Sequence, residues 1–217
     1  MTTRNQAHSF RFRTILNVFL SIYLLISANF AIADTAQTES IQTPVDNLHG
    51  ALISIMKSAE TMSFDERYKL LEDVIFKNFN TPLISRVILS RYWKSLDETS
   101  QNNFIDLFNQ LTISTYVSRF DSYNEETFKH LSIEPMKKGR YMVKTELVQS
   151  NNDNVSFNYI VQSDDNNWKI ISVIANGIND LSLKRGEYSA VIKDQGFNAL
   201  IENIKQKISD LQPNSSQ

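Results

Sequence analysis

The chain contains no cysteine, and only five glycines and four prolines among its 217 residues. Without cysteine, neither a disulfide bond nor a thiolate metal site can form, so an exported form must be held together by its hydrophobic core. No glycine-rich phosphate loop and no Gly-x-Ser-x-Gly nucleophile motif occurs. Beyond residue 33 the only histidines are His49 and His130, which stand in unrelated sequence contexts. These absences predict no metal, no cofactor and no catalytic centre, and hence a protein that is not an enzyme.

The first 33 residues have the pattern of a secretory signal peptide. Three arginines precede an apolar run over residues 15–26, and the segment contains no acidic residue. It ends in Ala31-Ile32-Ala33. Small residues at those two positions suit a signal peptidase. An uncleaved membrane anchor is the alternative, but the run is shorter than the roughly 20 residues that span a bilayer. We therefore expect residues 1–33 to be removed and the mature chain to start at Asp34.

Removal of this segment leaves 184 of the 217 residues, enough for a single domain over residues 34–217. The segment holds three of the 22 lysines and arginines and none of the 24 acids, so the mature chain has a net charge of −5. An acidic chain of this kind is not expected to bind nucleic acid.

Residues 44–123 show helical periodicity, with several recognisable helix starts. Thr43-Pro44 predicts a cap followed by proline at the first helical position, and Ser63 to Glu66 is a capping box. Residues 101–123 carry apolar side chains on two separate sectors. A helix of that kind is buried by more than one neighbour, so we expect it to lie between a layer of helices and a layer of another kind.

From residue 131 to residue 176 the apolar period changes to two, in four short segments joined by short polar turns. This pattern predicts a four-stranded antiparallel sheet. Two C-terminal helices are expected over residues 178–209, with a break at Gly196. The predicted fold class is therefore α+β: helices and a long central helix packed on an antiparallel sheet, so arranged that they enclose an apolar cavity.

The aromatic residues leave the function open on pattern alone. Side chains such as Phe104, Phe157 and Trp168 have helix or strand spacing, which is more often plain core than ligand lining. The acidic pairs, for example Asp97-Glu98, stand at predicted helix starts or turns, where capping explains them. A helix-on-sheet module of this composition is compatible with a binding cone, a small enzyme or an inert interaction domain.

A set of residues in order along the chain narrows this choice. In the C-terminal part the set is Trp168-Lys169-Ile170-Ile171-Ser172-Val173, Asn176-Gly177-Ile178, Leu183, Arg185, Tyr188, Gly196-Phe197 and Leu200-Ile201. In the N-terminal half it is Phe79, Ile84, Tyr92-Trp93, Gln101, Phe104, Phe108 and Thr115-Tyr116. Over residues 40–210 the chain thereby resembles the MlaC family, also called the toluene-tolerance family, whose members are periplasmic lipid carriers of ABC transport systems. Ser172 and Asn176 depart from the family pattern, which usually has Asp and Glu there.

The resemblance implies a cone similar to nuclear-transport-factor-like folds, whose interior holds the acyl chains of a phospholipid. It also implies a periplasmic, monomeric carrier whose partners are an inner-membrane ABC transporter complex and an outer-membrane lipoprotein. The run from Asp180 to Tyr188 is similar to the hopanoid-associated branch of the family, so a hopanoid is an alternative cargo. Two rival hypotheses are an exported enzyme on the same cone, which needs a titratable pair inside the pocket, and a lipid-free scaffold with a solid core.

Twelve residues are predicted to line the pocket because of the helix or strand faces they share: Leu83, Val87, Tyr92, Phe104, Phe108, Tyr116, Val143, Leu147, Phe157, Tyr159, Ile170 and Ile174. Ile178 is added because the resemblance implies an aliphatic residue there that borders the acyl chains. A shift of one residue in a strand would exchange its inward and outward faces, and with them the strand residues of this list.

Overall fold

The computed structural model describes residues 38–150, 153–165 and 167–212. The expected signal peptide and the mature start at Asp34 therefore lie outside the described residues. From residue 41 onward the described residues form one compact unit, and the helices, strands and cavity below belong to it. Its helical elements are a helix over residues 41–57, α2 (Phe64–Asn78), α3 (Thr81–Leu89), the 3₁₀ helix η1 (Ser90–Ser95), α4 (Glu98–Arg119), α5 (Asp180–Gln195) and α6 (Phe197–Leu211).

The sheet has five strands in the order β1-β2-β3-β4-β5, and every neighbouring pair is antiparallel. The strands are β1 (Thr127–Met136), β2 (Arg140–Val148), β3 (Val155–Asp164), β4 (Asn167–Ala175) and β5 (Ile178–Asn179). The antiparallel sheet and the α+β class are as predicted, and β5 is an addition. It forms because Asn176 and Gly177 both have positive φ, at 47° and 78°, which returns the chain so that Ile178 pairs with Ala175.

Local signals placed several helix starts correctly. Ser63 caps α2 with the full capping box, in which its side chain accepts from the Glu66 amide and the Glu66 carboxylate accepts from the Ser63 amide. Asp97 caps α4 by accepting from the Ser100 amide at 2.7 Å. Gly196, with φ of 89°, separates α5 from α6. Each of these interactions is made within a few residues, which is why the sequence pattern shows it.

Three predicted boundaries are wrong. Helical structure is already present before Thr43, so Pro44 is not at the first helical position. The extra turn places Ile41, 3% exposed, on the buried stripe that continues through Val45, and this burial favours the longer helix. At the other end, α4 stops at Arg119 and not at residue 123, and the sheet begins at Thr127 and not at residue 131.

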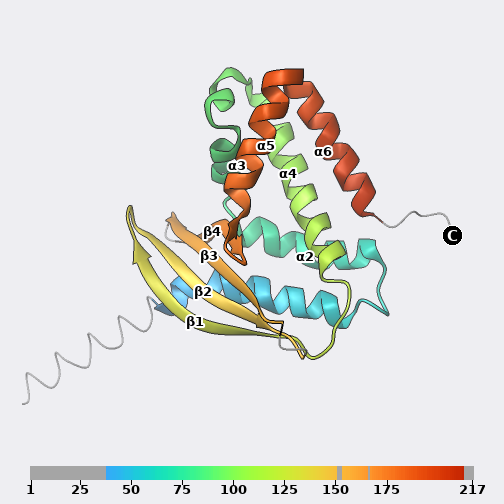
Figure 1. The fold of residues 1–217 in the computed structure, drawn as a ribbon, viewed down its shortest axis with the longest axis vertical. Coiled ribbons are helices and arrows are strands. Elements are labelled where there is room, and N and C mark those ends of the chain that lie inside the picture. The colour runs from blue at the N-terminus through green and yellow to red at the C-terminus, as the bar shows by residue number, and fades with distance from the viewer. Residues whose placement is uncertain (1–37, 151–152, 166, 213–217) are drawn as a thin grey trace, which may run out of the picture. The chain divides into compact units, whose positions relative to one another are not determined.

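The helix that lies along the sheet is the one over residues 41–57, as Figure 1 shows. Its His49 ring stacks on Phe128 of β1, with ring centroids 3.7 Å apart. The Nε2 atom of His49 is within hydrogen-bond distance, 3.0 Å, of the Tyr159 hydroxyl of β3. The central helix α4, which we expected against the sheet, packs instead against α2, α3 and α6. Its C-terminal end reaches the sheet through Phe120, whose ring centroid is 6.3 Å from that of Phe157.

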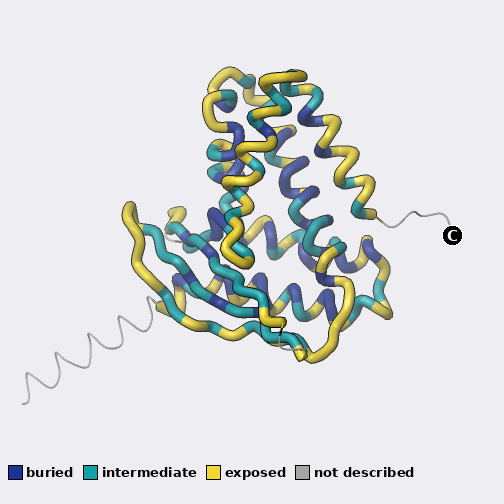
Figure 2. Tube along the Cα trace, viewed as in Figure 1, coloured by how far each residue is buried: buried dark blue, intermediate teal, exposed yellow. Residues whose placement is uncertain are grey.

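Figure 2 shows buried residues concentrated along α4 and along the helices beneath it. Phe104 and Ile113 of α4 have no exposed surface, and neither do Leu48 and Leu52 of the first helix. The unit therefore has one core around α4 and another layer between the first helix and the sheet, and these join in one hydrophobic cluster. Between the end of α4, the last strands and the two C-terminal helices, packing leaves a hollow.

Candidate ligand-binding cavity

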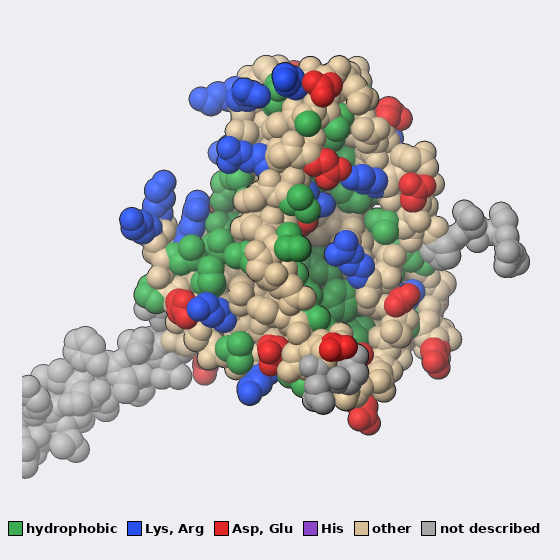
Figure 3. All heavy atoms as spheres, viewed as in Figure 1, with side chains coloured by type: hydrophobic (Ala, Val, Ile, Leu, Met, Phe, Trp, Pro, Cys, Tyr) green, Lys and Arg blue, Asp and Glu red, His purple; other side chains and the backbone are tan. Residues whose placement is uncertain are grey.

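The hollow is a cavity of about 630 Å³. That volume lies within the range of about 300–1,000 Å³ that small-molecule sites occupy. Its walls come from α2, α3, α4, the strands β3, β4 and β5, and the C-terminal helices α5 and α6. Figure 3 shows hydrophobic side chains in a hollow of the surface with charged side chains at its edge. No single element builds this site: α4 contributes six of the lining residues, and every other element contributes fewer.

The inner wall is apolar, and residues from helices, strands and the segments between them contribute to it. The apolar lining residues are Ile75, Phe79, Ile84, Ile88, Phe108, Leu111, Tyr116, Phe120, Phe157, Ile171, Val173, Ala175, Ile178, Leu181, Leu183 and Leu211. Thr112 and Thr115 also line it, although they carry hydroxyl groups. Their hydroxyls donate to the carbonyls of Phe108 at 2.8 Å and Leu111 at 2.6 Å, so neither threonine leaves a donor unpaired against hydrocarbon.

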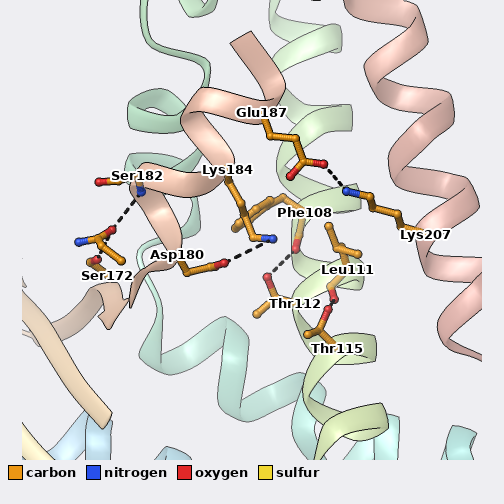
Figure 4. A network of polar contacts seen from close by, with 11 residues as sticks. Phe108, Leu111, Thr112, Thr115, Ser172, Asp180, Ser182, Lys184, Glu187 and Lys207 are labelled. Atoms are coloured by element: carbon orange, nitrogen blue, oxygen red, sulfur yellow. Dashed lines mark hydrogen bonds and ion pairs between the residues drawn. The ribbon is translucent and has the colours of Figure 1, made fainter. Parts of the chain in front are cut away.

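The rim of the cavity is charged. Five charged residues line it: Arg119, Asp180, Lys184, Lys207 and Asp210. All except the half-buried Lys184 are exposed, which places the charges at the opening and leaves the interior apolar. Figure 4 shows Asp180 and Lys184 extending from α5 toward α4, with 3.6 Å between the carboxylate and ammonium groups. In the same view Lys207 of α6 pairs with Glu187 of α5.

Tyr116 belongs to the apolar wall, where its ring contacts Phe79 and Phe120. Burial raises the pKa of its hydroxyl well above the ordinary value, nearby Asp180 raises it further, and Arg119 acts in the opposite direction. The hydroxyl is thus a neutral group at any physiological pH. The cavity therefore presents hydrocarbon and a buried, neutral phenol inside, and charges at its opening.

Four of the thirteen predicted residues line this cavity: Phe108, Tyr116, Phe157 and Ile178. Ile178 is 63% exposed, so it is a rim residue and not ordinary core. The other nine lie elsewhere: Leu83, Val87, Tyr92, Phe104, Val143, Leu147, Tyr159, Ile170 and Ile174. Whether any of the thirteen contacts a lipid stays a prediction.

On α3 the predicted stripe is one position off. Leu83 and Val87 are half-buried, and the neighbouring residues Ile84 and Ile88 line the cavity. Because α3 carries two adjacent aliphatic stripes, its sequence does not decide which of them faces the hollow. Tyr92 follows in η1, outside the cavity lining.

Phe104 was predicted as lining and is instead a contact between helices. It is fully buried, and its ring lies edge-to-face with Tyr188 of α5, with centroids 6.2 Å apart. Its centroid is also 6.4 Å from that of Phe197 in α6. Phe104 therefore joins α4 to the two C-terminal helices, a role that its position on an apolar stripe does not distinguish from ligand contact.

On the sheet, a β-bulge changes which residues face inward. Val173 pairs with Tyr159 while Ile170 pairs with Val161, and a register shift lies between Ile160 and Val161. The extra residue on β4 exchanges the faces beyond it. Ile171, Val173 and Ala175 therefore line the cavity where Ile174 was expected.

The remaining predicted strand residues lie farther along the sheet. Val143 pairs with Tyr159, so their side chains share one face of the sheet. Tyr159, Val143 and Leu147 are buried, and Ile170 has no exposed surface. The helix over residues 41–57 covers Tyr159, and its His49 contacts the Tyr159 hydroxyl. Strand alternation identified the inward face, and the position of this helix decided which part of that face stays open.

The two histidines, predicted to be unrelated, lie together. Ligand atoms of Asp46, His49 and His130 are within 4.8 Å of one another, which makes them the one group among the described residues that could hold a metal ion. The Nε2 atom of His130 is 2.6 Å from the Asp46 carboxylate, and that of His49 is 3.0 Å from the Tyr159 hydroxyl. None of the three lines the cavity. These contacts tie the first helix to β1 and β3.

The charged rim was missed by the sequence analysis. Lys207 and Asp210 lie on the polar side of the amphipathic helix α6, and Arg119 is the last residue of α4. Solvated charges usually take such positions. Asp180 stands in the first turn of α5, where an acid is expected for helix-dipole reasons. No sequence signal shows that these residues surround one opening.

The geometry so far defines a class: a small α+β domain with an apolar cavity whose opening is charged. The chain belongs to the MlaC family, because the family model described as MlaC protein matches residues 46–206. Comparison with curated protein sequences finds no match. Among the described ranges, none of the helices combines the length and apolar character that a membrane span requires.

The fold is similar to that of a phospholipid-binding protein from Ralstonia solanacearum, whose structure was determined in complex with a phospholipid. The TM-score is 0.69, and the match covers 79% of this chain and 96% of that one. The sequence identity is 18%, so this likeness concerns the fold.

Proposed function

We propose that this protein is a lipid carrier that encloses the acyl chains of a phospholipid in the cavity. The observation that carries this proposal is the cavity of about 630 Å³ with an apolar interior and charges confined to its opening. Membership of the MlaC family supports it, as does the likeness to a protein that was solved with a phospholipid. The proposed role is binding and transport, not catalysis.

Hydrophobic transfer energies explain why such a carrier needs a cavity. Exposing about 15 methylene groups to water costs on the order of 10 kcal/mol, at about 0.8 kcal/mol each. A protein that takes a lipid through water must therefore cover its tails. Transfer of the tails from a bilayer into an apolar cavity is close to neutral by the same reasoning. The direction of transport is then determined by the proteins that deliver and accept the lipid.

The volume bears on how much of a lipid fits. At about 630 Å³ the cavity is of the size that sites for small organic molecules have, which suits the hydrocarbon part of a lipid. A diacyl lipid is accommodated if the cavity widens or if part of the second chain lies along the rim, where Ile178 and Leu183 are exposed apolar side chains.

The proposal includes export and partners. The signal-peptide pattern of residues 1–33 supports export to the periplasm. There the carrier exchanges lipid with an inner-membrane ABC transporter complex and an outer-membrane lipoprotein. Cell fractionation tests the location: the full chain should appear in the periplasmic fraction, and a chain that begins at Asp34 should stay in the cytoplasm. If the full chain and the chain that begins at Asp34 are found in the same fractions, the result counts against export.

Native mass spectrometry of protein purified from cells tests lipid binding directly. We expect a bound species whose mass identifies a phospholipid, or a hopanoid if that alternative cargo is the true one. Protein that never carries lipid, and takes none from vesicles, would contradict the function. The lipid-free scaffold hypothesis expected a solid core, and the cavity speaks against it.

A further inference from the structure

Three side chains of the types that bind metal ions come together where the first helix meets the sheet. Asp46 and His49 lie three residues apart in the helix over residues 41–57, a spacing that places both on one face of the helix. His130 comes from β1, 84 positions farther along the chain than Asp46. One donor atom of each residue lies within 4.8 Å of the donor atoms of the other two. Figure 1 shows this helix alongside the strands.

These distances are close to those of an assembled metal site. In a tetrahedral zinc site with bonds of about 2.0 Å, neighbouring donor atoms lie about 3.3 Å apart. The Nε2 atom of His130 and the carboxylate of Asp46 are 2.6 Å apart, because they share a proton. A metal ion that replaces this proton moves the two atoms apart by about 0.7 Å. The side chain of Asp46 is 50% exposed, so it has room for this shift.

Each histidine also has a ring nitrogen to spare. His49 uses Nε2 at the Tyr159 hydroxyl, and His130 uses Nε2 at Asp46. Among the residues that the structure describes, Nδ1 of His130 is buried without a hydrogen-bond partner, and Nδ1 of His49 makes no hydrogen bond either. A buried polar atom without a partner is uncommon, because its lost hydration is not compensated. A bound metal ion supplies such compensation.

The surroundings of the three residues suit a bound ion. The His49 ring is 6% exposed and stacks on Phe128, which fixes its orientation. Its contact with the Tyr159 hydroxyl is of the kind that orients histidine ligands in metal sites. On the outer side, the side chains of Asp46 and His130 are 50% and 31% exposed. An ion therefore has a route from solvent, and water can complete its coordination.

We propose that Asp46, His49 and His130 bind a divalent transition-metal ion of the zinc type. Two imidazoles and one carboxylate favour zinc and its first-row neighbours over Ca²⁺ and Mg²⁺, which prefer oxygen ligands. The ion joins the first helix to β1, the strand at one edge of the sheet, and so holds the helix in place. None of the three residues lines the cavity, so the proposal does not depend on the lipid-carrier function.

The alternative is that hydrogen bonds alone hold these elements together. His130 contacts Asp46, and His49 contacts Tyr159, without any ion. The two hypotheses differ in the effect of added metal on stability. An ion that binds only the folded state raises Tm by mass action, whereas a set of hydrogen bonds that binds no ion leaves Tm unchanged.

Isothermal titration calorimetry of the mature protein, freed of metal with a chelator, tests the site with Zn²⁺. The chain is untagged, because a histidine tag binds the same ions. We expect one Zn²⁺ per chain with micromolar affinity, and no binding of Ca²⁺ or Mg²⁺ at the same concentrations. Excess Zn²⁺ should raise Tm by several degrees, and EDTA should reverse the rise.

Variants locate the bound ion. His130→Gln removes a ligand and should weaken Zn²⁺ binding at least about a hundredfold, because loss of a group that only orients a ligand already costs about 10- to 100-fold. Asp46→Asn keeps the shape of an exposed side chain and removes the anionic ligand, so it should fold normally and bind at least about tenfold more weakly. The matched control is Asp106→Asn, which alters an exposed aspartate of α4 outside this group and should bind as the wild type does.

Three results would overturn the metal site. The first is a wild type that binds no Zn²⁺, which would leave the hydrogen bonds as the whole function of these residues. The second is equal affinity in the wild type, Asp46→Asn and His130→Gln, which would place the ion elsewhere. The third is an unchanged Tm at saturating Zn²⁺, which would show that the ion does not hold the first helix on the sheet. Because no lipid enters these measurements, a failure of the carrier function would leave them unaffected.

Discussion

His49 lies inside the protein, 6% exposed, between the first helix and the sheet. Burial lowers its pKa to about 3, and nearby His130 contributes to the decrease. The ring is therefore neutral at pH 7, as its hydrogen bond to the Tyr159 hydroxyl allows. In the unfolded chain the same side chain takes up a proton near pH 6.5.

This difference predicts a loss of stability in acid. Between the two pKa values the unfolded state binds one proton more than the folded state, so the free energy of unfolding falls as the pH decreases. From pH 7.5 to pH 5 we expect the His49 contribution to be a loss of about 2 kcal/mol. Urea unfolding of the wild type and of His49→Gln over this range measures it. Two stability curves that stay parallel would show that His49 does not titrate in this way.

Ile178 supplies a prediction about lipid binding. The side chain is 63% exposed and lines the cavity, so Ile178→Glu places a carboxylate at the rim, where it can reach water. We expect a change of about 0.5 kcal/mol or less in the free energy of unfolding. Lipid loading should fall about tenfold, because the charge borders the acyl chains.

The control for Ile178→Glu is Leu131→Glu. Leu131 of β1 is 54% exposed and does not line the cavity. Its substitution should leave lipid loading unchanged in the same mass-spectrometric measurement. Full lipid content in a folded Ile178→Glu protein would place the acyl chains away from this rim.

At the scale of elements, the junction of α5 and α6 depends on one glycine. Gly196 has φ of 89° and ψ of 169°, a conformation that side chains other than glycine rarely adopt. Gly186 lies within α5 in ordinary helical geometry, with open space around the position of an added Cβ. The substitution of alanine for glycine can therefore be compared at a position where alanine is strained and at one where it is not.

Gly196→Ala should lower the free energy of unfolding by about 1–3 kcal/mol, because alanine is strained there. Gly186→Ala should raise it by up to about 1 kcal/mol, because alanine favours the helix and restricts the unfolded chain. Chemical denaturation of both variants measures the pair. Equal effects of the same sign would mean that the φ of Gly196 does not constrain this junction.

The helices and strands also show which structural features the local sequence predicts and which it does not. The capping box at Ser63 and the break at Gly196 were predictable because each involves residues within one helical turn. The faces of α3 and β4 were not. On α3 the two aliphatic stripes are equivalent until a neighbour covers one of them. On β4 the bulge opposite Ile160 exchanges the faces without a signal in the alternation itself.

At the scale of the whole molecule, the carrier function predicts that bound lipid stabilises the protein. A ligand that binds only the folded state adds about 2.7 kcal/mol at a free concentration of 100 times Kd. For a domain of this size that raises Tm by several degrees. Thermal unfolding of delipidated and reloaded protein measures the difference. An identical Tm for the two forms would mean that the lipid does not occupy the folded domain.

The sequence alone determined the absence of disulfides and thiolate metal sites, the caps and breaks of the helices, the α+β class and the resemblance to the MlaC family. These depend on composition and on interactions between residues close in the chain. The tertiary structure decided which apolar faces border the cavity, the meeting of His49 with His130, and the approach of Arg119 and Asp210 to one opening. A cavity is the space that packing leaves unfilled, so it depends on how all the surrounding elements pack together and not on any one segment.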